Sequence, residues 1–131
     1  MERPVTVGVV GLGRGGHLAD IAAALPGVRV VAGCDAAGPL AAAFSARYPE
    51  ARLTPTFDAL LDVPFDVLIL ASYCPDHGPQ AVRALQAGRH VLSEVTAFHT
   101  PAEGVALVEA VEASGRHYMM AENTCYRART F

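Results

Sequence analysis

Short apolar runs alternate along this chain with alanine-rich stretches whose apolar residues recur at helical spacing. The apolar runs predict strands at 5–10, 28–33, 51–53, 65–71, 90–92 and 117–121. The stretches between them predict helices at 14–25, 39–48, 56–61, 76–87 and 101–114. Strands that alternate with helices are typical of a parallel sheet with helices on both faces. The pattern therefore predicts an α/β fold, a doubly wound parallel sheet of five or six strands.

The segment Phe65–Ala71 has the strongest strand character, because its residues 67–70 are all apolar. A strand that is buried on both faces needs such a run, so we expect this one at the centre of the sheet. The pair Met119 and Met120 is expected in the core at the end of the last strand.

Length and composition bound the kind of protein. The chain has 131 residues, 52% of them hydrophobic, and a net charge of −3, which is enough for a single packed domain over residues 1–131. Acidic and basic residues are interspersed, so the sequence shows no basic cluster that would bind nucleic acid or an anionic membrane surface. The ten basic residues are all arginine, and the absence of lysine excludes chemistry that requires a lysine.

Three cysteines that form no C-x-x-C pair predict neither a disulfide framework nor a zinc knuckle. The histidines lack metal-ligand spacing, so no metal site is predicted. The sequence shows no signal peptide and no run long enough to span a membrane. We therefore expect a cytoplasmic protein. The last residues of the sequence contain no pattern that ends a helix or strand, so we also expect the chain to be a piece of a longer one.

A glycine-rich turn follows the first predicted strand directly. It reads Gly11-Leu12-Gly13-Arg14-Gly15-Gly16 and continues into the first predicted helix. In this G-x-G-x-x-G context the first glycine permits a tight turn, the second admits a pyrophosphate, and the third lets helix and strand pack closely. The turn therefore predicts a Rossmann dinucleotide site, with strand order 3-2-1-4-5-6.

Asp35 ends the second predicted strand, 19 residues beyond Gly16. A carboxylate at this place can accept hydrogen bonds from both hydroxyls of the adenosine ribose. It would also repel a 2′-phosphate, so NAD is favoured over NADP. Two alternatives stay open: a methyltransferase that binds S-adenosylmethionine, and a turn that is merely structural in a non-catalytic binding domain.

The residues Val7–Gly16, Asp66–Ala71, His77 and Ala84–Glu94 together resemble the amino-terminal domain of the Gfo/Idh/MocA oxidoreductases. The resemblance covers essentially the whole chain. It implies NAD as cofactor, hydride transfer with a sugar- or polyol-like substrate, and a second domain that completes the substrate pocket and the homo-oligomer interface. That second domain is missing from these 131 residues, so we expect cofactor binding without turnover.

The family signature after the fifth strand is Glu-Lys-Pro, whereas this chain has Glu94-Val95-Thr96. Together with Tyr118–Arg127, this variation is similar to a subset that includes NAD-dependent α-N-acetylgalactosaminidase-like glycosidases. In that subset the resemblance implies a redox-neutral cycle, in which bound NAD oxidises a sugar hydroxyl, the glycosidic bond breaks by elimination, and the hydride returns. A glycosidase is therefore the alternative to a dehydrogenase.

Several residues outside the turn are candidates for the cofactor cleft because they follow predicted strands. Glu94 ends the fifth strand, where ligands of open α/β sheets bind, and His77 opens the helix after the central strand. The candidates for catalysis are Glu94, His77 and Tyr126, and those for cofactor contact beyond the turn and Asp35 are Ser72, Tyr73, His77, Glu94 and Asn123.

Overall fold

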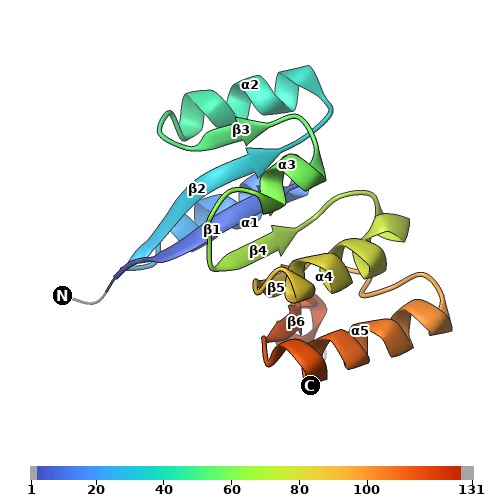
Figure 1. Ribbon diagram of the computed structural model, residues 1–131. Coiled ribbons are helices and arrows are strands. Elements are labelled where there is room, and N and C mark those ends of the chain that lie inside the picture. Colours follow the sequence, from blue (N-terminus) through green and yellow to red (C-terminus); the bar gives the residue numbers. More distant parts are fainter. Residues whose placement is uncertain (1–2, 128–131) are drawn as a thin grey trace.

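Six parallel strands form one sheet in the order β3-β2-β1-β4-β5-β6, as the sequence predicted. The computed structural model describes residues 3–127 (Figure 1). The strands are β1 (Val5–Val10), β2 (Val28–Cys34), β3 (Arg52–Thr54), β4 (Val67–Leu70), β5 (His90–Ser93) and β6 (Tyr118–Met120). The helices are α1 (Arg14–Ala23), α2 (Gly38–Arg47), α3 (Phe57–Leu61), α4 (His77–Gln86) and α5 (Pro101–Ser114).

Helices cover the sheet in two layers, one on each face. One apolar cluster unites Ala19 of α1 and Phe44 of α2 with β1 and β2. The second cluster unites Leu60 of α3, Leu85 of α4 and Leu107 of α5 with the opposite face. In Figure 1 the helices α3, α4 and α5 lie in front of the strands, and α1 lies behind them. Burial of both faces explains the continuous apolar runs of the strands.

The central strand β4 is the most completely buried part of the sheet. Its side chains Leu68, Ile69 and Leu70 are at most 1% exposed, and the strand pairs with β1 on one side and β5 on the other. The sequence prediction of its position is confirmed, although the strand itself is shorter than the predicted 65–71.

Some apolar residues lie differently from what their pattern predicts. Met119 and Met120, expected in the core, are 56% and 39% exposed, so that prediction was wrong. Ile21 and Leu25, which share the helical spacing of the first helix, are also exposed. Helix α1 instead buries the small residues Gly15 and Ala19, because it packs closely on the sheet.

The carboxyl ends of all six strands meet at one edge of the sheet, because every pairing is parallel. Chain order reverses at this edge between β1 and β4: the strands run β1, β2, β3 in one direction and β4, β5, β6 in the other. Ligands of open α/β sheets bind at such a switch point. Within residues 3–127 no helix has the length and apolarity needed to cross a membrane.

Candidate functional site

The turn between β1 and α1 passes directly over the end of β4. Gly11 has a positive φ of 79°, and a Cβ placed on it would lie 2.1 Å from the carbonyl oxygen of Ala71. A Cβ on Gly15 would lie 2.9 Å from Cγ1 of Val9. Only glycine fits at position 11 without displacing backbone. The close packing of α1 against β1 depends on Gly15 and not, as predicted, on Gly16, because a Cβ on Gly16 would meet no atom within 4 Å.

The amino end of helix α1 has no side-chain cap. Its N-cap is Gly13, which offers no capping side chain, and its first turn contains no acidic residue. The first amides of a helix lack partners within the helix, and the helix dipole makes this end positive. The end of α1 at the switch point is therefore suited to an anion such as a pyrophosphate.

Asp35 follows β2 and holds the glycine turn in place. Its Oδ2 accepts a hydrogen bond of 2.6 Å from the backbone N–H of Leu12, and its Oδ1 accepts one of 2.7 Å from that of Ala37. Each carboxylate oxygen retains further acceptor capacity. The side chain can thus fix the turn and still accept hydrogen bonds from a ligand at the same edge.

A hollow of about 520 Å³ lies along the strand ends on the Asp35 side of the switch point. The predicted residues that line it are Gly11, Gly13, Arg14, Asp35, Ser72 and Tyr73. Sequence reasoning missed its contributors Leu40, Pro55, Thr56, Phe57 and Gln80. These residues follow β2, β3 and β4 along the chain, so the predicted strand order was the signal that could have found them, because it brings the segments after these strands to one edge.

A second hollow of about 520 Å³ lies beyond Arg14, between α1 and the segment after β6. It is lined by the predicted residues Asn123 and Tyr126, together with His17 and Glu122. Arg14 lines both hollows. Its side chain therefore stands at the boundary between the part of the edge that carries Asp35 and the part that follows β6.

Glu94 follows β5 and is paired with Arg14, but it lines neither hollow. Its Oε1 accepts a hydrogen bond of 3.2 Å from Nε of Arg14, and the Glu94 side chain is 16% exposed. Its Oε2 is buried and has no hydrogen-bond partner within residues 3–127. The backbone N–H of Glu94 donates to the carbonyl of Leu70 at 2.7 Å, so the residue is fixed to the end of β4.

His77 is buried, with 1% of its surface exposed, and lines neither of these two hollows. Its Nδ1 lies 2.7 Å from the carbonyl oxygen of Thr96, and its Nε2 lies 3.0 Å from that of Ser72. A neutral ring can donate to one of these oxygens, and a doubly protonated ring to both. The imidazole thus connects the loop after β4 with the loop after β5.

The remaining predicted residues have simpler settings. Leu12 is buried in the turn itself, while Gly15, which is buried, and Gly16 lie in the first turn of α1. The hydroxyl of Ser72 donates to Oε1 of Gln80 at 2.6 Å. Tyr73 and Tyr126 are 75% and 78% exposed, which leaves both phenol rings accessible to a ligand.

The Cys34 thiol, at the end of β2, is buried beside this site. Burial raises the pKa of the thiol, so Cys34 forms an apolar wall rather than a nucleophile. No group of three or more metal-ligating side chains occurs among the residues that the structure describes.

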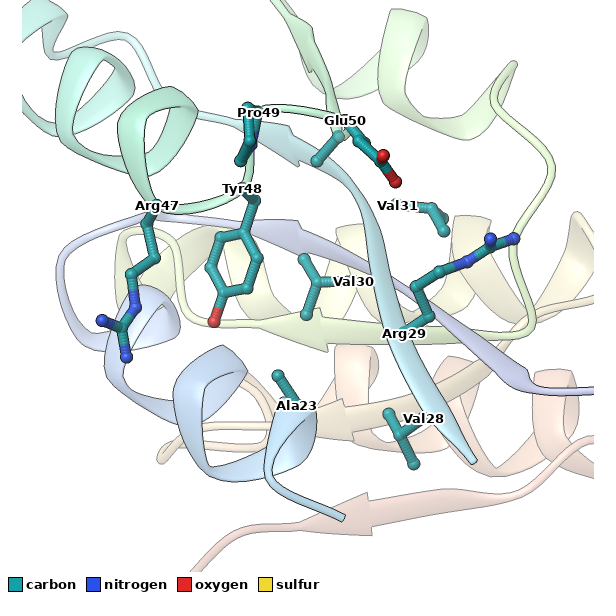
Figure 2. A pocket seen from close by; sticks show the side chains of 10 residues that line it. Ala23, Val28, Arg29, Val30, Val31, Arg47, Tyr48, Pro49 and Glu50 are labelled. Atoms are coloured by element: carbon teal, nitrogen blue, oxygen red, sulfur yellow. The ribbon is translucent and has the colours of Figure 1, made fainter. Parts of the chain in front are cut away.

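A further hollow lies at the opposite edge of the sheet, between the end of α2 and the start of β2 (Figure 2). There the hydroxyl of Tyr48 donates to Oδ1 of Asp20 at 2.5 Å, and Arg47 pairs with the same oxygen. Burial, together with the hydrogen bond to Asp20, raises the pKa of Tyr48 to about 12. The phenol therefore stays protonated at neutral pH, and this network joins α1 to the end of α2.

Comparison with known protein families shows to which family this chain belongs. The model described as an oxidoreductase family with an NAD-binding Rossmann fold matches residues 5–122. This chain belongs to the Gfo/Idh/MocA oxidoreductase family. It is an NAD-binding Rossmann domain of that family, and the prediction of fold, family and cofactor is confirmed.

Individual members of the family show what this Gfo/Idh/MocA domain is similar to. A glycosyl hydrolase family 109 protein from Solibacter usitatus is 34% identical, with 93% of this chain and 31% of the relative covered. An inositol 2-dehydrogenase from Acidothermus cellulolyticus is 30% identical, with 90% and 36% covered. The chain thus spans about a third of the length of these relatives.

Among solved structures, the WlbA dehydrogenase from Bordetella pertussis, in complex with NADH and UDP-GlcNAcA, has a TM-score of 0.86. It is 27% identical, and the match covers 96% of this chain and 37% of that one.

The residues of this Gfo/Idh/MocA domain fit a dinucleotide. Glycine at positions 11 and 15 lets the turn and the start of α1 lie close against the ends of β1 and β4, and α1 has neither a side-chain cap nor an acidic residue in its first turn. Oε2 of Glu94 is a buried acceptor without a partner in the described part of the chain. These features supply a place for the pyrophosphate and a hydrogen-bond acceptor farther along the edge.

We predict that His77→Phe lowers the free energy of unfolding by about 1–3 kcal/mol, because the buried imidazole no longer bonds the carbonyl oxygens of Ser72 and Thr96. Urea denaturation measures the effect. His99→Phe is the matched control, since His99 is exposed and should change stability by less than about 0.5 kcal/mol. Equal midpoints for the two variants would contradict the role of His77 as a connection between the two loops.

Proposed function

We propose that NAD lies along the carboxyl edge of the sheet, with its pyrophosphate over Gly11–Gly16 and its adenosine ribose on Asp35. The observation that carries this proposal is the hydrogen bond of 2.6 Å between Asp35 Oδ2 and the N–H of Leu12. It joins the ribose acceptor to the phosphate turn, so that one rigid unit carries both.

The nicotinamide half then extends past Arg14 toward the end of β5. Glu94 is the proposed acceptor for this half, and Ser72 and Tyr73 flank it from the loop after β4. Asn123 and Tyr126 border the second hollow on the far side of Arg14, where a substrate would meet the nicotinamide. His77 acts as a positioning residue, because its buried ring joins the loops after β4 and β5.

We propose that this domain works within a longer polypeptide that transfers hydride between NAD and a sugar- or polyol-like substrate. Support comes from the relatives, which include an inositol 2-dehydrogenase and extend well beyond the length of this chain. Bound nicotinamide supplies the hydride acceptor and donor, while the protein binds and orients the substrate. The additional part of the polypeptide would complete the substrate pocket and form a homo-oligomer.

A redox-neutral glycosidase is the second candidate. The sequence similarity to a glycosyl hydrolase family 109 protein covers 93% of this chain and includes the segment Glu94-Val95-Thr96. Both candidates use the same cofactor site. We also propose a cytoplasmic location, because Cys34, Cys74 and Cys125 are all free thiols, as a reducing compartment would leave them.

We predict that Asp35→Asn weakens NAD binding by about tenfold or more, because a charged acceptor of ribose hydrogen bonds is lost. NADP should lose less affinity, since the repulsion of its 2′-phosphate is lost at the same time. Asparagine retains one acceptor oxygen for the turn, and any shared loss through the turn cancels in the ratio of the two affinities.

Calorimetric titration with NAD and NADP measures this ratio. Asp62→Asn, at an exposed acidic residue after α3, is the matched control and should leave the ratio unchanged. Equal losses for the two cofactors in Asp35→Asn would show that Asp35 does not accept the ribose hydroxyls.

The two candidate reactions predict different products from the complete polypeptide that carries this domain. A dehydrogenase accumulates NADH with a free sugar or polyol, which absorbance at the reduced nicotinamide band detects. A glycosidase instead releases the leaving group of an aryl glycoside without net NADH. We expect the complete polypeptide to produce net NADH, and we expect no turnover by the 131-residue chain alone. Aryl release without net NADH would favour the glycosidase.

A further inference from the structure

One ion pair crosses the middle of the proposed cofactor site. Arg14 is the first residue of α1, directly after the β1 turn, and Glu94 follows β5. Strand β4 lies between β1 and β5, so the 3.2 Å contact between Arg14 Nε and Glu94 Oε1 passes over the end of β4. The backbone bond from Glu94 to Leu70 holds the carboxylate at this place.

The two partners differ in their access to solvent. The Glu94 side chain is 16% exposed and the Arg14 side chain 46% exposed. One oxygen of Glu94 is bound to Arg14, and the other is buried without a partner in the described part of the chain. The carboxylate thus depends on Arg14 for its counter-charge, while Arg14 can exchange contacts with a ligand on either side.

Arg14 is the sole arginine that borders either hollow of the carboxyl edge within residues 3–127, and the chain contains no lysine. Apart from His17, which lines the second hollow, it is the basic side chain nearest to the proposed path of the cofactor. The other titratable side chains of the two hollows that the structure describes include Asp35 in the first and His17 and Glu122 in the second, and replacing either member of the pair leaves them in place.

We infer that the Arg14–Glu94 pair sets the preference of the domain between oxidised and reduced nicotinamide. This inference rests on the proposed placement of the nicotinamide beside Glu94. The nicotinamide ring carries a positive charge in NAD⁺ and none in NADH, because reduction adds a hydride. A carboxylate nearby favours the oxidised ring and a guanidinium favours the reduced one, so the intact pair nearly balances the two forms.

Each half of the pair can be removed separately, and the two changes have opposite signs. Arg14→Gln leaves the Glu94 carboxylate without its counter-charge, which shifts the preference toward NAD⁺. Glu94→Gln leaves the guanidinium, which shifts it toward NADH. For charges about 8 Å apart at an effective dielectric constant of about 20–40, each shift is about five- to thirty-fold in the affinity ratio.

The ratio of the affinities for NAD⁺ and NADH is a selective readout, because both forms of the cofactor carry the same adenosine and pyrophosphate. A contact between Arg14 and the pyrophosphate changes both affinities equally and cancels. Arg14→Lys keeps the positive charge and should restore most of the ratio of the unaltered chain. Arg29→Gln removes an exposed charge at the opposite edge and should leave the ratio unchanged.

The experiment is titration of the 131-residue chain and these variants with NAD⁺ by calorimetry and with NADH by fluorescence. Opposite shifts in Arg14→Gln and Glu94→Gln, with near-normal behaviour of Arg14→Lys, are the expected result. Equal losses for both cofactor forms would overturn the inference and leave the proposed function intact. If the unaltered chain bound neither form, the proposed function would fail together with the inference.

Discussion

The close approach of the Gly11 turn to the end of β4 is the contact on which the rest of the site depends. A Cβ at this glycine would lie 2.1 Å from a carbonyl oxygen of the neighbouring loop, so the turn can take this path only with glycine. The path directs the amino end of α1 toward the switch point. It also places the N–H of Leu12 within 2.6 Å of Asp35, which joins the turn to the end of β2.

The other parts of the site are arranged around this contact by the sheet itself. The loops after β4 and β5 reach the same edge because all strands are parallel, and the buried ring of His77 connects them. Arg14 and Glu94 then span the end of β4. The site therefore combines a rigid half, made of backbone and Asp35, with a half whose character depends on a single pair of opposite charges.

The fold and the glycine turn after β1 were predictable from the sequence because their signals are local. The apolar runs, the glycine spacing and the acid at the end of β2 each depend on a few consecutive residues. The partners of Glu94 and His77 were not predictable in this way. Arg14 and Glu94 are separated by 80 residues, and His77 meets two backbone carbonyls, which have no sequence signature.

Local signals also fail to predict which apolar side chains stay exposed, as they do at Met119, Met120, Ile21 and Leu25. Periodicity shows which residues share a face, and it does not show whether another element covers that face. Helix α1 lies close to the sheet through Gly15 and Ala19, and Leu18 packs partly against the same cluster, whereas Ile21 remains exposed. The second hollow, beside Met119 and Met120, lies on this part of the surface.

The most direct test of the central claim is a two-dimensional amide NMR spectrum of the chain, recorded with increasing NAD. Binding at the switch point predicts shifts at the amides of Leu12, Gly13 and Ala37. It predicts no shifts at Arg29 and Glu50, which border the hollow at the opposite edge (Figure 2). Shifts confined to that opposite edge, or no shifts at saturating NAD, would contradict the placement of the cofactor on the Gly11 turn.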